Sequence, residues 1–148
     1  MDIEPVYYEI SSENSQRETN EFKQLAELTE EQAKIYSNPD FSRLQKDYIY
    51  RGFKKGLSID QVFIYANPKL NAFQMAVIYQ GLIFGLTTKQ VLVYATPDFN
   101  EMQMQEICYG FRHGLKEKDV LMFAQSNYTW QEMKDMREQL EHQQTLNL

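Results

Sequence analysis

The chain has 148 residues, a formal net charge of -6 and 43% hydrophobic residues, a length and composition that fit one domain with a buried core and exclude a disordered chain. A single cysteine, Cys108, excludes an internal disulfide framework. The chain shows neither a basic and apolar leader nor a stretch of about 20 apolar residues. We therefore expect a cytoplasmic protein that does not span a membrane.

The N-terminal part of the chain is acidic. Residues 1–28 hold seven acidic and two basic side chains. We interpret residues 1–14 as an acidic arm and residues 15–148 as a single domain. Ser15 is followed three residues later by Glu18, which is the spacing of a helix-starting capping box. This pair predicts a capping helix over about residues 16–27.

After this helix, the same residue types return every 29 positions. The prolines show the period most clearly, because they stand at Pro39, Pro68 and Pro97. The same offset relates leucines, aromatic residues and glutamines: Leu28, Leu57, Leu86 and Leu115; Tyr36, Tyr65, Tyr94 and Phe123; Gln45, Gln74, Gln103 and Glu132. A constant period over four units predicts a repeat architecture. The units span about 28–56, 57–85, 86–114 and 115–143.

Each unit contains two signals for the start of a helix. Thr29, Ser58 and Thr87 precede a glutamine by three residues, as in a capping box. They predict short helices, and the fourth unit is expected to follow the same pattern: about 30–36, 59–65, 88–94 and 117–123. Ser42, Asn71, Asn100 and Thr129 precede a glutamine or glutamate in the same way. They predict longer helices over about 43–55, 72–84, 101–113 and 130–142.

Prolines and glycines mark where these helices end. Proline disfavours helix continuation after each of the first three short helices. Gly56, Gly85 and Gly114 stand where a left-handed residue would end the long helices. Three further glycines lie inside the long helices, where glycine costs about 1 kcal/mol relative to alanine: Gly52, Gly81 and Gly110. Their recurrence predicts that a neighbouring helix approaches closely at these positions.

The second and fourth units differ from the others in a way that suggests their places in a stack. Middle units of a stack are covered on both sides, so their surfaces are expected to be more apolar than those of the ends. The second unit is more apolar at Phe63, Phe73, Val77, Ile83 and Phe84. The fourth unit has lost its proline and glycines and has a charged last helix. We therefore expect an all-α, solenoid-like array of four tandem helix-turn-helix repeats with an N-terminal capping helix and a C-terminal cap.

One motif resembles a known group of repeats. It runs Tyr65-Ala66-Asn67-Pro68, Gln74-Met75, Ile78 and Gly81, and returns one period later from Tyr94 to Gly110. This motif resembles short helical repeats in uncharacterised proteins of low-GC Gram-positive bacteria and of their phages and mobile elements. The resemblance covers about residues 28–143 and implies a fold but no activity. It differs from tetratricopeptide, ankyrin and HEAT repeats in period and in signature residues.

The residues that catalysis and metal binding require are sparse. His113 and His142 are the only histidines, and two imidazoles without a third ligand make a poor zinc site. Cys108 is expected to be a packing residue. No glycine-rich phosphate loop is present, and no carboxylate pair is indicated by spacing. We therefore predict no catalytic residues, no metal, no cofactor and no enzyme activity.

Three sets of side chains are candidates for contact with a partner. An acidic face on the last helix comprises Glu132, Asp135, Glu138 and Glu141. A basic face on the first long helix comprises Arg43, Lys46, Arg51, Lys54 and Lys55. Aromatic residues at positions that vary between units are contact candidates because tyrosine and tryptophan are frequent in interface hot spots: Tyr48, Tyr50, Tyr79, Tyr109 and Trp130. A solvated face explains the basic set at least as well as a binding site does, and inter-helix packing is the alternative for half or more of the aromatic residues.

The absence of catalytic clusters favours a non-catalytic protein-binding scaffold. By analogy with mobile-element proteins, we expect the role to be inhibition of a host defence nuclease, of the anti-CRISPR type, in which the acidic face would occupy a basic groove of a nucleic-acid-processing enzyme. One alternative is a nucleic-acid-binding repeat that uses the basic face with Tyr48 and Tyr50. Another is a structural homodimer or larger homo-oligomer formed through Phe73, Val77, Ile83 and Phe84.

Overall fold

The structure, a computed structural model, describes residues 20–147, and this part of the chain is helical without a strand. The predicted all-α class is therefore confirmed. A first helix covers residues 20–26. The short helices are α2 (Glu30–Tyr36), α4 (Ile59–Tyr65), α6 (Thr88–Leu92) and α8 (Glu117–Phe123). The long helices are α3 (Arg43–Lys54), α5 (Ala72–Phe84), α7 (Glu101–Arg112) and α9 (Trp130–Leu146).

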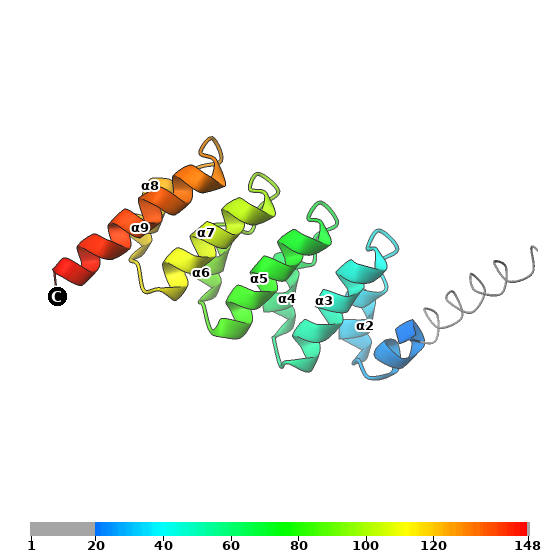
Figure 1. Ribbon diagram of the computed structural model, residues 1–148. Helices are drawn as coiled ribbons and strands as arrows, with labels where there is room; N and C mark the ends of the chain where they lie inside the picture. Colours follow the sequence, from blue (N-terminus) through cyan, green and yellow to red (C-terminus); the bar gives the residue numbers. More distant parts are fainter. Residues whose placement is uncertain (1–19, 148) are drawn as a thin grey trace, which may run out of the picture.

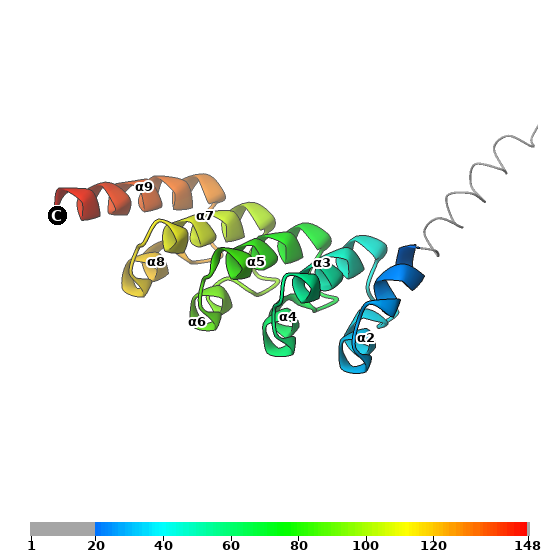
Figure 2. The ribbon, with the colours of Figure 1, turned by 90° about the horizontal axis from the view of Figure 1, so that it is seen from below.

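Short and long helices alternate along the chain and lie in two layers (Figures 1 and 2). Figure 2 shows the long helices side by side in one layer and the short helices in the other. Within the long-helix layer, α3 packs against α5, α5 against α7, and α7 against α9. The helix of residues 20–26 lies at one end of this row and α9 at the other. None of the helices in residues 20–147 is both long and apolar enough to cross a membrane.

The helix starts lie where the sequence predicts them, because the capping side chains form the expected hydrogen bonds. In each of α2 to α7, the N-cap side chain accepts a hydrogen bond from the backbone N–H of the third helical residue, which is a glutamine. The side chain of this glutamine in turn accepts a hydrogen bond from the backbone N–H of the N-cap residue. The ends agree less closely with prediction. Helix α6 stops at Leu92, short of the predicted end at 94, and α9 continues past the predicted end at 142 to Leu146. The predicted acidic arm and the pair Ser15–Glu18 lie outside the described residues.

A left-handed glycine ends each of the first three long helices. Gly56, Gly85 and Gly114 have φ angles of 89°, 109° and 87°. In each case the next residue, a leucine, donates its backbone N–H to the carbonyl of the glycine inside the helix, as Leu86 does to Gly81 at 3.0 Å. This pairing is the Schellman motif. The two glycines of each unit thus belong to one helix-ending device.

The interior glycines make room for an aromatic ring from the following short helix. A Cβ on Gly52 would collide with the hydroxyl of Tyr65, and one on Gly81 with the hydroxyl of Tyr94. A Cβ on Gly110 would stand 3.0 Å from Cζ of Phe123. The predicted close approach at these positions is confirmed.

The repeated glutamine links each long helix to the next unit. Nε2 of Gln74 donates to the carbonyl of Phe99 at 2.7 Å, and Nε2 of Gln45 donates to Leu70 in the same way at 2.6 Å. The Oε1 of each glutamine closes its own capping box. One side chain therefore starts a helix and contacts the following unit. At the equivalent position of α9, which ends the row, the residue is Glu132.

The neighbours of the second unit do not cover four of its five extra apolar residues. Only Val77 is buried, with 7% of its surface exposed, whereas Phe63, Phe73 and Phe84 are 57%, 65% and 55% exposed and Ile83 is exposed as well. Neighbours in a single row cover the flanks of a helix, where Val77 lies. They leave the outward faces of both layers uncovered.

Candidate protein interface

The outward face of α5 is the most apolar surface of the long-helix layer. Helical spacing of three, four and seven residues places five side chains along this face: Phe73, Ala76, Gln80, Ile83 and Phe84. The opposite face, with Met75, Ile78 and Leu82, packs in the core. A helix that is apolar on all sides is usually buried on all sides. Helix α5 is apolar around most of its circumference, apart from Gln80 on the outward face, and yet that face is exposed.

The neighbouring long helices extend this face at the N-terminal end of α5. Leu44 of α3 and Met102 of α7 occupy the positions equivalent to Phe73 in the units before and after it, and all three side chains are exposed. Because α3 and α7 both pack against α5, the three residues form a row across adjacent helices. Exposed apolar side chains grouped on one face are typical of sites that bind another macromolecule.

The C-terminal end of α5 has basic neighbours. At the positions equivalent to Ile83 and Phe84, the chain has Lys54 and Lys55 at the end of α3, and Arg112 and His113 at the end of α7. The guanidinium carbon of Arg112 lies 4.5 Å from the ring centroid of Phe84. Lys54 is paired with Glu27 at 3.2 Å. We name Ile83, Phe84, Lys55 and Arg112 the basic-apolar patch.

A second apolar row lies on the short-helix layer. Phe63, Leu92 and Leu121 occupy equivalent positions of α4, α6 and α8 in successive units, and all three are exposed. Sequence reasoning named Phe73, Ile83 and Phe84 as a surface for self-association. It missed Leu44, Met102 and the row on the short helices, although the constant period between units contained the signal. Ile49, Gly52 and Phe53 mark the buried face of the first long helix. Large apolar residues that recur in successive units outside such a buried face indicate an exposed row.

The predicted basic face is not one continuous surface. Lys46 lies 4.0 Å from Glu21, and Lys54 is paired with Glu27, so acids of residues 20–27 compensate both. The guanidinium of Arg51 lies 5.1 Å from the ring centroid of Tyr48. Arg43 lines a hollow that also contains Asp47. Lys55 is exposed and belongs to the basic-apolar patch.

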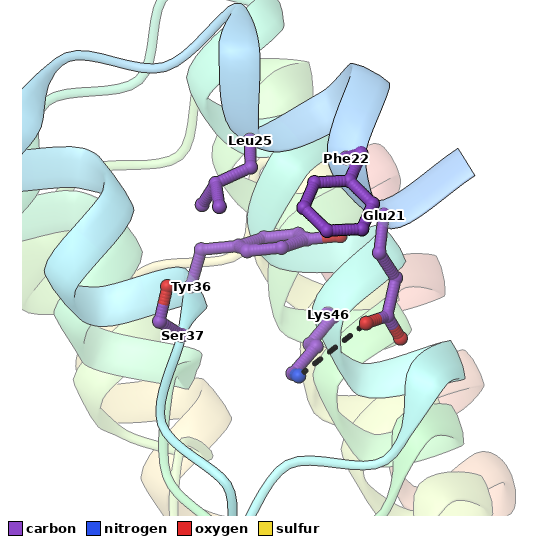
Figure 3. A pocket seen from close by; sticks show the side chains of 6 residues that line it. All are labelled: Glu21, Phe22, Leu25, Tyr36, Ser37 and Lys46. Carbon is purple, nitrogen blue, oxygen red and sulfur yellow. Dashed lines mark ion pairs between the residues drawn. The ribbon is translucent and has the colours of Figure 1, made fainter. Parts of the chain in front are cut away.

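A hollow at the N-terminal end of the row is lined by both apolar and charged groups. Figure 3 shows the ring of Tyr36 beneath Leu25 and Phe22, with the pair Glu21–Lys46 nearby. Tyr36 donates its hydroxyl proton to Gln24 at 2.6 Å. Burial, together with the charges of Glu21 and Asp47, raises the pKa of Tyr36 to about 12. This phenol therefore stays neutral at physiological pH.

The predicted acidic face separates into two groups. Glu132, Asp135 and Glu138 are exposed on α9. Glu141 is half-buried, accepts two hydrogen bonds from Arg137 at 3.0 Å, and lies 2.7 Å from Nδ1 of His113. Three of the four candidate acids are therefore available to a partner, whereas the fourth is engaged by Arg137 and His113.

Arg137 links α9 to α7 through a buried ion pair. Its Nε donates to Glu106 at 2.8 Å, and both side chains are less than one-tenth exposed. Burial acts to lower the pKa of Arg137, but hydrogen bonds to Glu106 and Glu141 outweigh it, and the pKa is raised. The guanidinium remains charged and fixes the last helix to its neighbour.

The candidate aromatic residues are half-buried, and four of them pack with or hydrogen-bond to residues of adjacent helices. The ring of Tyr79 contacts Tyr48 at 5.7 Å and Tyr65 at 6.3 Å between centroids. Tyr50 donates to Glu27. Tyr109 stacks on His113 and lies under Arg137. Trp130 is half-buried at the start of α9.

The chemistry of the nucleophile and metal candidates is limited. Cys108 is buried, and this burial raises the pKa of its thiol, so the reactive thiolate is disfavoured. In residues 20–147 no three histidine, cysteine, aspartate or glutamate side chains are grouped as a metal site would require.

Comparison of the chain with protein-family models, curated proteins and solved structures found no match.

Proposed function

We propose that this protein is a non-catalytic, protein-binding scaffold built as a solenoid-like array of four helical repeats, and that it binds through the outward face of α5 and its neighbours. The observation that carries the proposal is the exposure of an apolar helix face. Phe73, Ile83 and Phe84 remain in contact with water although the same helix buries Ile78 completely. Burial of a large apolar side chain is worth about 1.5–3 kcal/mol, so a partner that covers this face gains substantial free energy.

The inter-unit contacts support a scaffold role, because they hold neighbouring helices in a fixed register. The ring of Tyr94 against Gly81 and the amide of Gln74 on Phe99 both join adjacent units. Rigid presentation of apolar side chains lowers the entropic cost of binding.

Site-specific photocrosslinking tests this proposal. Benzoylphenylalanine replaces Phe73 or Phe84, and the protein is incubated with extract of the cells that produce it. Gln131 and His142 of α9 occupy the equivalent positions and serve as matched controls. We expect one protein to be crosslinked from both α5 positions and from neither control. Excess wild-type protein should compete, whereas the variant Phe73→Ser/Phe84→Ser should not. Equal crosslinking from α9, or none from α5, would overturn the proposal.

A narrower role, inhibition of a host defence nuclease, remains a proposal that rests on the resemblance to mobile-element repeats. Exposed Glu132, Asp135 and Glu138 supply acidity that could face a basic groove. Reversal of these three residues to lysine should then slow association with the crosslinked protein and reduce its salt dependence. Unchanged association would exclude this acidic face.

The nucleic-acid alternative is less favoured because Glu21 and Glu27 compensate two of its five basic residues. Electrophoretic shift with DNA and RNA at low salt separates it from protein binding. A shift that is lost in Lys54→Glu/Lys55→Glu would reverse our preference.

A further inference from the structure

We infer that the partner segment bound at the C-terminal end of α5 is acidic and carries a large apolar side chain. This inference rests on the proposed function and specifies the chemistry of its ligand. It comes from the basic-apolar patch, where an exposed apolar pair stands between basic residues of the helices on either side.

The geometry of the patch is set by the constant register between units. Ile83 and Phe84 end α5, and the equivalent residues Lys54 and Lys55 lie at the end of α3. On the other side, Arg112 ends α7 and lies 4.5 Å above the ring of Phe84. Helices α3, α5 and α7 lie next to one another (Figure 1). The residues at their C-terminal ends are therefore basic, apolar and basic in that order.

The charges available to a ligand are those without an acidic partner in the protein. Lys54 is paired with Glu27, and His113 lies against Glu141. Lys55 and Arg112 form no ion pair with an acid of residues 20–147. Arg112 lies against the ring of Phe84, and Lys55 occupies the position equivalent to Phe84 at the end of the helix on the other side. These two cations can therefore pair with carboxylates on both sides of an apolar side chain that covers Phe84.

A basic ligand is disfavoured for the same reason. It would place like charges next to Lys55 and Arg112, which costs binding free energy. A purely apolar ligand would cover Ile83 and Phe84 but would desolvate the two cations without compensation. A segment with carboxylates and a large apolar side chain can pair with the two cations and also cover Ile83 and Phe84.

Selection from a displayed library of random peptides tests this inference with the full-length chain as bait. We expect the enriched peptides to be net acidic and to share at least one large apolar residue. Their affinity should fall by at least about tenfold for Lys55→Glu/Arg112→Glu and for Phe84→Ser. The matched control, Lys116→Glu/Lys118→Glu, makes the same charge change on exposed residues at the start of α8 and should bind like the wild type. Circular dichroism verifies that each variant folds.

The outcomes separate this inference from the proposed function. Enriched peptides that are neutral or basic, but lose binding with Phe73→Ser/Phe84→Ser, would overturn the acidic chemistry and leave the α5 face as a binding site. Peptides that bind equally to every α5 variant would contradict both. Acidic peptides that lose binding only with the α8 control would also overturn the inference.

Discussion

The hydroxyl of Tyr94 occupies the space that a side chain on Gly81 would need. The same relationship joins Tyr65 to Gly52 one unit earlier, whereas Phe123, which lacks the hydroxyl, stands opposite Gly110. The glycine inside each of these three long helices is thus matched to a ring in the next short helix along the chain.

We expect Gly81→Ala to destabilise the protein by about 1–3 kcal/mol, because overpacking at this contact exceeds the gain of about 1 kcal/mol in helix propensity. In the Tyr94→Phe background the same change should cost less, since the colliding hydroxyl is gone. A double-mutant cycle by urea denaturation measures this coupling. Gln139→Ala, at the equivalent position of α9, should have little effect. Additive effects of Gly81→Ala and Tyr94→Phe would refute the contact.

The two equivalent tyrosines should respond differently to loss of the hydroxyl. Tyr65 donates to the carbonyl of Tyr48 at 2.7 Å, whereas the buried hydroxyl of Tyr94 meets no nitrogen or oxygen partner within residues 20–147 and has only the weakly polar thiol of Cys108 beside it. Tyr65→Phe is therefore expected to cost about 0.5–1.5 kcal/mol. Tyr94→Phe should be neutral or stabilising because it removes an unsatisfied polar group. Thermal denaturation of both variants measures the two changes in stability. Equal destabilisation would contradict the difference in hydrogen bonding between the two hydroxyl groups.

Replacement of Gln74 tests the link between units. Gln74→Glu keeps the acceptor of the capping box but removes the donor to Phe99, so it should cost about 1–3 kcal/mol. Glu132→Gln is the reverse change at the end of the row and should alter stability by less than about 0.5 kcal/mol. The unfolding free energies of the two variants provide the comparison. Similar values for both would mean that the amide does not join the units.

The buried ion pair of Arg137 and Glu106 makes the packing of α9 on α7 depend on both charges being present. Arg137→Leu leaves Glu106 buried without its partner and should cost about 3–5 kcal/mol. Glu106→Leu added to this variant should restore much of that loss, because no unpaired charge then remains. Denaturant titration of the single and double variants measures both steps. A loss below about 1 kcal/mol for Arg137→Leu would show that the pair is solvated.

The sequence predicted the helix starts well because capping boxes are local signals, as Thr29 and Gln32 illustrate. It also predicted a close contact at Gly81, but not that its partner is Tyr94, since that pairing depends on how the units stack. The surface was predicted less well for the same reason. The second unit was expected to be covered by its neighbours on both sides, yet its Phe73 and Phe84 are exposed, whereas Arg137 of the charged last helix is buried. Helical periodicity specifies which residues share a face, but not which faces receive a neighbour.

The central claim is that the outward face of α5 is free in the folded protein and is used by a different protein. Sedimentation equilibrium of the wild type and of Phe73→Ser/Phe84→Ser, combined with their unfolding free energies, tests this claim most directly. We expect both proteins to be monomers whose unfolding free energies agree within about 0.5 kcal/mol, as for exposed sites. A wild-type dimer that dissociates in the variant would show that the face joins two copies of this chain. A loss of several kcal/mol in a monomeric variant would show that the face belongs to the core, and either result would contradict the claim.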